Sequence, residues 1–380
     1  MTPRRSWFNH AFQAPLSPGV GEALASLLAE IGEGPLPAER RRAIRESARE
    51  AAAAFLGVPD GEIVLTAGGT EAANLAIKGA ARALGSRRIV ATAVEHLSVL
   101  HPIRSLARQG WEFELVRVDP CGRVDLDALR RALATPAALV SVQHANHEVG
   151  TVQPVEEAAA MAHGAGALLH VDAAASAPWR AVPVGPGGAD LVSLSGAPLG
   201  ALPGSGALRV REGVRVLPLV EGGTQEGGRR AGELDPLALR SLDVAARRVT
   251  GRRRERWARI EALRDRLEAG LGERIGGMTV QGGGPGGRLP GHLHASFPGA
   301  EGEALLFRLR RAGVEASTGS TCAESIGKPS HVLEAMDLER ERIQCSLLLS
   351  LGPESRDEDV DRVLDVLPAA VQQLRTIAGG

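Results

Sequence analysis

The most informative feature of this 380-residue sequence is what it lacks. It contains no tyrosine, and of its 44 basic residues only two, Lys78 and Lys328, are lysine, while the rest are arginine. Any chemistry that needs a lysine amine therefore has two candidates. The three cysteines, Cys121, Cys322 and Cys345, lie far apart and are odd in number, which does not fit a disulfide framework.

Long apolar runs and an excess of charge are missing as well. No apolar run approaches the roughly 20 residues that span a bilayer, and the first residues lead into no signal-peptide core. The formal net charge is −1, so there is no overall basic field to attract nucleic acid or anionic lipid. We therefore expect a soluble, cytoplasmic globular protein that binds neither nucleic acid nor a membrane.

The order of apolar runs and helical patterns predicts an α/β fold. Short strand-like runs alternate with helix-like segments, which indicates a mostly parallel seven-stranded sheet with helices on both faces. The seven predicted strands are residues 63–66, 88–92, 113–118, 138–142, 167–171, 191–195 and 206–210.

The C-terminal third of the sequence has a different pattern. A long helical pattern over 237–270 and a glycine-rich connector at 281–287 precede two more strand-like runs, at 293–297 and 345–351. We predict a large domain over residues 13–245. A smaller α+β domain would combine residues 1–12 with residues 246–380.

Polar residues follow several of the predicted strands. Because ligands bind outside the carboxyl ends of the strands in open α/β sheets, these residues are expected to converge on one site. Gly69 and Thr70 open a helix, where free backbone N–H groups favour a phosphate. The other residues at strand ends are Glu95, His96, His144, Asn146, His147, Glu148, Asp172 and Ser195. Together they predict a small-molecule site.

A metal site is the alternative interpretation of the segment His144-Ala-Asn-His147-Glu148. A zinc-binding helix needs the spacing His-Glu-x-x-His, which places both imidazoles on one face. Here the segment follows a strand and contains Gly150 and Pro154 shortly afterwards, which is typical of a loop. We expect no metal.

Several motifs resemble those of the cysteine desulfurases, in the class V aminotransferase group with the type I fold of pyridoxal-phosphate enzymes. The similarity covers nearly the whole chain. The matching segments are Leu65-Thr-Ala-Gly-Gly-Thr-Glu-Ala-Ala-Asn-Leu-Ala-Ile-Lys-Gly79, Glu95-His96, Asn146-His-Glu-Val-Gly-Thr-Val-Gln153, His170-Val-Asp172, Ser317-Thr-Gly-Ser-Thr-Cys322, Pro329-Ser-His-Val-Leu-Glu-Ala-Met336 and Ser350-Leu-Gly352.

The resemblance implies roles for individual residues. The catalytic residues would be Cys322, as the persulfide-forming thiol, and His96, whose ring stacks on the cofactor. Asp172 would hold the pyridine nitrogen protonated. The full set of implied cofactor-binding residues is Gly69, Thr70, His96, Asn146, Asp172 and Ser195. The family also implies a dimer, because each site is built across two subunits, and a sulfur-acceptor protein.

Five positions depart from the family pattern, and all of them concern the cofactor or the substrate. Aligning Ser195 with the family motif Ser-x-His-Lys places Ala197 at the histidine and Pro198 at the lysine that forms the Schiff base. Without that amine the chain cannot form its own internal aldimine. The other departures are Leu348 for the arginine that binds the substrate carboxylate, Ala175 for a glutamine, and Glu233 for a threonine that reaches the neighbouring subunit's phosphate.

Neither remaining lysine is well placed as a substitute. Lys78 lies about 12 Å along its helix from Thr70, at 1.5 Å per residue, and Lys328 lies in the segment of Cys322. Three hypotheses remain open. The first is a degenerate cysteine desulfurase that acts as a persulfide-relay or scaffold subunit, as a homodimer or with an intact paralogue. The second is an active desulfurase or lyase that holds pyridoxal phosphate non-covalently. The third is a non-enzymatic module that binds an anion or another small molecule.

Overall fold

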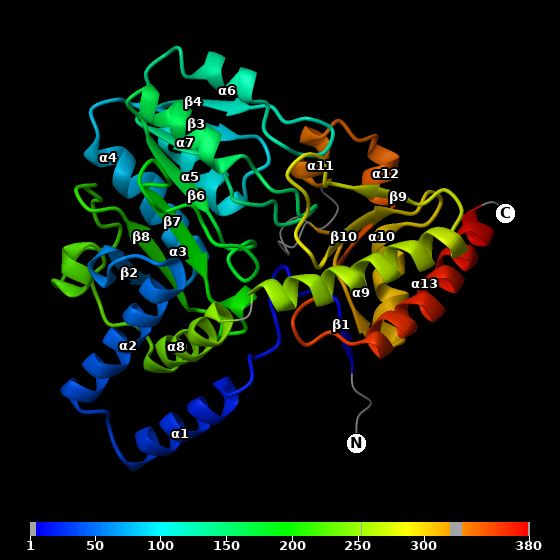
Figure 1. Ribbon diagram of the computed structural model, residues 1–380, viewed down its shortest axis with the longest axis horizontal. Helices are drawn as coiled ribbons and strands as arrows, with labels where there is room; N and C mark the ends of the chain where they lie inside the picture. The colour runs from blue at the N-terminus through cyan, green and yellow to red at the C-terminus, as the bar shows by residue number, and fades with distance from the viewer. Residues whose placement is uncertain (1–4, 252, 320–328, 379–380) are drawn as a thin grey trace.

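The computed structural model describes residues 5–251, 253–319 and 329–378. Its largest element is a seven-stranded sheet flanked by helices, in the strand order β2-β8-β7-β6-β5-β3-β4 (Figure 1). The fold class predicted from the sequence is confirmed. The strands are β2 (Ile63–Thr66), β3 (Arg88–Thr92), β4 (Glu112–Val116), β5 (Leu139–Ser141), β6 (Leu168–Asp172), β7 (Leu191–Ser195) and β8 (Gly206–Val210).

Only β8 runs against its neighbours. It pairs antiparallel with β7 and with β2, whereas β4, β3, β5, β6 and β7 pair in parallel. Since β2 and β7 both oppose β8, β2 points the same way as the parallel strands. The carboxyl ends of β2, β3, β5, β6 and β7 therefore lie along one edge of the sheet.

Alternate residues of the strands enter two hydrophobic cores, one on each face of the sheet. In β2, Ile63 and Leu65 pack in one core and Val64 in the other, as the two-residue period of a strand requires. The helices of this part of the chain are α1 (Val20–Glu33), α2 (Ala38–Leu56), α3 (Gly69–Asn74), the π-helical turn η2 (Leu75–Ala80), α4 (Ala81–Ala83), α5 (Leu97–Ala107), α6 (Leu126–Ala132), α7 (Val155–Gly164) and α8 (Pro236–Thr250).

The C-terminal part of the chain forms its own sheet, in the order β12-β10-β9, and buries a third core. The N-terminal segment joins it, because β1 pairs in parallel with β11 and the N–H of Ser350 donates to the carbonyl of Phe8. The elements are β1 (Ser6–Trp7), α9 (Arg253–Arg274), β9 (Thr279–Gln281), β10 (His292–Ser296), α10 (Gly302–Arg311), β11 (Val314–Glu315), α11 (His331–Ala335), α12 (Arg340–Gln344), β12 (Ser346–Ser350) and α13 (Asp357–Ala378).

The helical pattern predicted over 237–270 is confirmed as helix, but in two parts. The chain forms two helices there, since α8 ends at Thr250 with Gly251 as its C-cap and α9 begins at Arg253. The remaining short elements are the 3-10 turns η1 (Asp60–Glu62), η3 (Ala197–Leu199) and η4 (Gln225–Gly228). None of the helices within the described ranges combines the length and the apolar character that crossing a membrane demands.

Candidate functional site

A cavity of about 300 Å³ opens at the carboxyl ends of β2, β3, β5, β6 and β7. Residues from the loops after these five strands line it, together with Ala11 and Phe12 from the N-terminal segment. Five of the six residues predicted to bind a cofactor are in the lining: Gly69, Thr70, His96, Asp172 and Ser195. The sheet topology brings them together, because parallel strands deliver their carboxyl ends to one edge.

One end of the cavity is formed by Gly68, Gly69 and Thr70, which we call the phosphate cradle. Gly68 has φ 131°, and no side chain caps the helix that begins at Gly69. A Cβ atom on Gly69 would lie only 2.9 Å from the Cβ atom of Ser195, so glycine is required there for spacing. Backbone N–H groups at the start of a helix favour an anion, which makes this end suited to a phosphate.

His96 forms one wall of the cavity and its ring is held in place by the backbone. It is the N-cap of α5: its Nδ1 accepts a hydrogen bond from the N–H of Ser98 at 3.1 Å and lies 2.7 Å from the Ser98 hydroxyl. Burial lowers the pKa of His96, although the charge of Asp172 opposes that shift. An Nδ1 that accepts from an N–H is unprotonated, so His96 presents a neutral ring to the cavity.

Asp172, at the end of β6, supplies the carboxylate of the cavity. One of its oxygens accepts a hydrogen bond from the N–H of Ala174 at 3.0 Å, and the residue is 9% exposed. A fixed carboxylate in a mostly buried place stabilises a facing cation or a protonated nitrogen.

Apolar residues form a further part of the cavity wall. Ala197 and Pro198 belong to the 3-10 turn η3 directly after β7, and both line the cavity together with Ala175. The proline ring carries no donor and no nucleophile. The positions at which the family pattern has histidine, lysine and glutamine are thus apolar here.

Three predicted residues lie elsewhere. Asn146 is buried inside its own turn, where its Oδ1 accepts from the N–H groups of Glu148 and Val149 and its Nδ2 donates to a carbonyl. Leu348 is a fully buried core residue of β12. Glu233 has 61% of its side chain exposed and forms an ion pair with Arg41 at 3.3 Å. None of the three is part of the cavity lining that the structure describes.

Of the two lysines and the predicted catalytic cysteine, the structure describes only Lys78. Cys322 and Lys328 lie outside the described residues. Lys78 lies in η2 and is not part of the cavity lining. Of the described cysteines, Cys345 is buried and Cys121 is half-buried, and both are free.

His147, one of the polar residues that follow the predicted strands, also lines the cavity, although the family resemblance implied no role for it. Its ring meets the ring of His96 edge-on, with the centroids 4.9 Å apart. Burial lowers the pKa of His147 well below its ordinary value, and the neighbouring His96 and His331 act in the same direction. The sequence feature that pointed to His147 is its position shortly after β5, next to Asn146.

A buried carboxyl group lies behind the cavity. Glu95 accepts hydrogen bonds from the Thr92 hydroxyl and the Gln143 N–H through Oε1, each at 2.7 Å. Its Oε2 is buried without a hydrogen-bond partner among the described residues. Burial raises the pKa of Glu95 to about 8, so the group is mainly protonated at neutral pH.

The comparisons with known proteins agree with this geometry. Residues 35–363 match the family model described as Aminotransferase class-V. The chain is 44% identical to a cysteine desulfurase of Gluconacetobacter diazotrophicus over 335 residues, which cover 87% of this chain and 84% of that protein. It is 37% identical to cysteine desulfurase IscS 1 of Archaeoglobus fulgidus, with 98% of each chain covered. The chain belongs to the cysteine desulfurase family.

The solved structures support the same placement. A structure described as a NifS-like protein matches with a TM-score of 0.86 and 28% identity over 99% of both chains. The family implies pyridoxal phosphate as cofactor, and the cavity fits its non-covalent features. The phosphate cradle suits the phosphate, the fixed ring of His96 suits a flat heterocycle, and Asp172 suits a protonated ring nitrogen. The wall at Pro198 does not fit a covalent link, because it offers no amine.

Proposed function

We propose that this desulfurase-family protein is degenerate and cannot anchor pyridoxal phosphate covalently. The observation that supports this is the place of Pro198 in the cavity wall, three residues after the end of β7, in a chain with only two lysines. When bound in this family, the cofactor supplies an electron sink for bond cleavage next to an amino group. The residues present here bind and orient such a ring, and Pro198 does not provide the amine that would anchor it.

We propose that the protein takes part in sulfur transfer as a persulfide-relay or scaffold subunit. In a relay the thiolate of Cys322 attacks the outer sulfur of a partner's persulfide. A new S–S bond forms on Cys322, the partner's S–S bond breaks, and the partner's thiolate leaves, so no external oxidant is needed. An acceptor protein then removes the sulfur by the same exchange.

The proposed partner is a second copy or an intact paralogue. Members of the family build each site across two subunits, through the loop that here holds Arg230 and Glu233. The family motif there is Arg-x-Gly-Thr, and this chain has Arg230-Ala-Gly-Glu233. Arg230 is thus retained and donates to Glu71 at 2.9 Å, whereas Glu233 adds a negative charge where the family pattern has a threonine. A glutamate facing a phosphate repels it, so a heterodimer with an intact paralogue fits this loop as well as a homodimer does. A cytoplasmic location and the division into residues 13–245 and residues 1–12 with 246–380 belong to the same proposal.

The test starts with the absorbance spectrum of the purified protein after pyridoxal phosphate is added. A cysteine-to-sulfide assay follows, with and without candidate intact paralogues of the same organism. The expected result is no sulfide from the protein alone, co-purification with a paralogue, and a persulfide on Cys322 when that paralogue turns over cysteine. Sulfide production by the protein alone at a rate typical of a desulfurase overturns the proposal.

The intact cradle, His96 and Asp172 favour a second candidate, an active desulfurase or lyase with non-covalently held pyridoxal phosphate. This candidate predicts a yellow protein that releases sulfide from cysteine under reductant. A colourless protein that binds only inorganic phosphate would instead indicate a non-enzymatic binding module.

A further inference from the structure

The strand that leads to the phosphate cradle is an edge strand. β2 pairs with β8 on one side and has no strand on the other, in the sheet order that the structure describes. An edge strand leaves every second N–H and C=O without a ladder partner. In β2 the groups at this open edge include the carbonyl of Ile63 and the N–H of Leu65.

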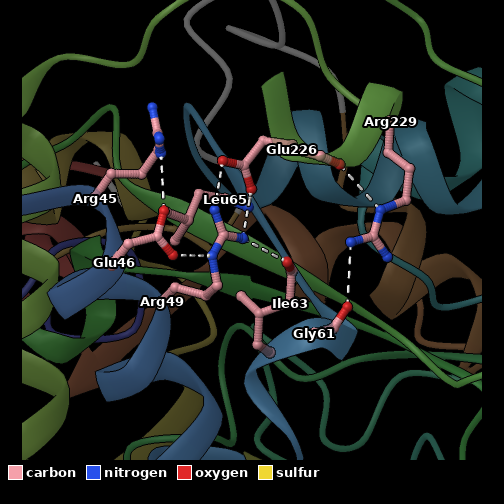
Figure 2. Close-up of polar contacts among 8 residues, drawn as sticks. All are labelled: Arg45, Glu46, Arg49, Gly61, Ile63, Leu65, Glu226 and Arg229. Atoms are coloured by element: carbon pink, nitrogen blue, oxygen red, sulfur yellow. Dashed lines mark hydrogen bonds and ion pairs between the residues drawn. The ribbon is translucent and has the colours of Figure 1, made fainter. Parts of the chain in front are cut away.

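An ion pair occupies the place of the missing strand (Figure 2). Glu226 Oε2 accepts from the N–H of Leu65 at 2.8 Å, and Arg49 Nη1 donates to the carbonyl of Ile63 at 2.8 Å. The two side chains also bind each other through two parallel hydrogen bonds of 2.8 Å. Their exposed fractions are 12% for Arg49 and 1% for Glu226.

The segment Glu226–Arg230 holds β2 at two further points. Before the strand, Arg229 Nη2 donates to the carbonyl of Gly61 at 3.2 Å. After the strand, Arg230 Nε donates to Glu71 Oε1 at 2.9 Å, and Glu71 Oε2 accepts from the N–H of Ala67 at 2.8 Å. The segment Glu226–Arg230 thus contacts the chain at three places: just before β2, along the open edge of β2 and, through Glu71, just before the phosphate cradle.

The backbone of this segment adopts a conformation that side-chain contacts must stabilise. Glu226 has φ 52° and is followed by Gly227 at φ 64° and Gly228 at φ 75°. A non-glycine residue in the left-handed region is uncommon and costs free energy. Although burial acts to lower it, the hydrogen bonds that Arg49 donates to Glu226 hold the pKa of Arg49 above its ordinary value, so Arg49 stays charged in this contact.

We propose that Glu226 is a positioning residue that sets the geometry of the phosphate cradle. This inference rests on the proposed function, in which the cavity keeps its affinity for the phosphate ester of a flat heterocycle. Only Ala67 separates Thr66, the last residue of β2, from Gly68 and Gly69, so a displacement of Leu65 moves the N–H groups that would bind the phosphate. Because hydrogen bonds to an anion depend steeply on distance, a small displacement lowers affinity.

The experiment compares the wild type with Glu226→Gln and with Glu30→Gln as the matched control. Glu30 forms a similar two-pronged pair with Arg40, but on the exposed surface, where it joins α1 to α2. Affinities for pyridoxal 5′-phosphate and for inorganic phosphate are measured by calorimetry. Amide hydrogen exchange of the peptide over residues 63–70 is measured by mass spectrometry without any ligand.

Glu226→Gln is expected to weaken both affinities about tenfold and to speed exchange over residues 63–70, whereas Glu30→Gln changes neither. Arg49→Lys keeps the charge but loses the two-pronged contact, and it is expected to weaken binding several-fold. If Glu226→Gln does not fold, the affinity and exchange measurements on Arg49→Lys test the inference instead.

A lower melting temperature with unchanged affinity and unchanged exchange over residues 63–70 would mean that Glu226 is merely structural, and it would overturn the inference. If the wild type binds neither compound, the proposed retention of the cofactor cavity fails. The exchange measurement then still decides the inference, because it needs no ligand.

Discussion

The ring of His147 meets the ring of His96 at an interplanar angle of 82°, with the two centroids 4.9 Å apart. This edge-to-face contact supports the residue that forms the wall of the cavity. His147 has 12% of its side chain exposed, and its Nδ1 is buried without a hydrogen-bond partner among the described residues. A neutral imidazole suits such surroundings, and a charged one does not.

His147→Asn should make the protein less sensitive to acid. The folded-state pKa of His147 lies well below 6.5 because of burial, so between pH 6.5 and that lower value the unfolded chain binds a proton that the folded chain does not. Stability is therefore lost as the pH falls. Between pH 7 and pH 5 the wild type should lose up to about 2 kcal/mol more than the variant. Urea unfolding at both pH values measures this, and the exposed His101→Asn serves as control.

The sequence was sufficient to predict the main sheet and the residues along its edge. The strands 63–66, 88–92, 191–195 and 206–210 agree with the structure to the residue. Buried parallel strands are short apolar runs bounded by polar and glycine residues, which is a strong local signal. Because the carboxyl ends of such strands share an edge, Gly69, Asp172 and Ser195 could be grouped without a structure.

Other features depend on contacts between distant residues and left no local signal. Helix α1, which begins at Val20, has no side-chain N-cap. The side-chain amide of Asn146, which the sequence predicted to bind a ligand, instead forms hydrogen bonds with the backbone of its own turn. The contact between Glu226 and Arg49 joins residues 177 positions apart. Such placements follow from tertiary packing, which sequence periodicity does not encode.

Pro198→Lys should restore a covalent link to the cofactor. The position lies in the cavity wall, and in a 3-10 turn a lysine replaces proline without losing a backbone hydrogen bond. After borohydride reduction with pyridoxal phosphate, peptide mapping should find the adduct at position 198 in the variant and at no cavity position in the wild type. Pro186→Lys, at an exposed glycine-rich turn, measures non-specific labelling. A wild-type adduct on Lys78 or Lys328 would contradict the prediction.

Glu95→Gln should become increasingly stabilising relative to the wild type as the pH rises. Burial raises the folded-state pKa of Glu95 to about 8 from the ordinary 4.5. Between these values the unfolded chain releases a proton that the folded chain keeps, so wild-type stability falls with rising pH. From pH 6 to pH 9 the difference should grow by about 2–3 kcal/mol, at roughly 1.4 kcal/mol per pKa unit.

Urea unfolding across this pH range checks the prediction for Glu95. Glu339→Gln is the control, since 81% of its side chain is exposed. A stability difference between Glu95→Gln and the wild type that stays constant from pH 6 to pH 9 would show that Glu95 is ionised throughout.

Gly69→Ala should weaken phosphate binding, and Ser195→Gly should compensate for it. The new methyl group would lie 2.9 Å from the Cβ atom of Ser195, which is closer than carbon atoms pack, so the start of α3 must move away from β7. Removing the Ser195 Cβ atom creates the space again. Affinity for pyridoxal 5′-phosphate, measured by calorimetry, is expected to fall about tenfold in Gly69→Ala. Most of it should return in the double variant.

The control for this pair is Gly21→Ala in α1, where an added Cβ atom meets nothing within 4 Å. It should leave the affinity unchanged. Ser195→Gly alone adds no atom to the cavity and serves as the second reference. If the double variant binds no better than Gly69→Ala, the steric contact with Ser195 is not what requires glycine at position 69. The requirement would then lie in the approach of the ligand itself to the backbone of the cradle, which a compensating change in β7 cannot relieve.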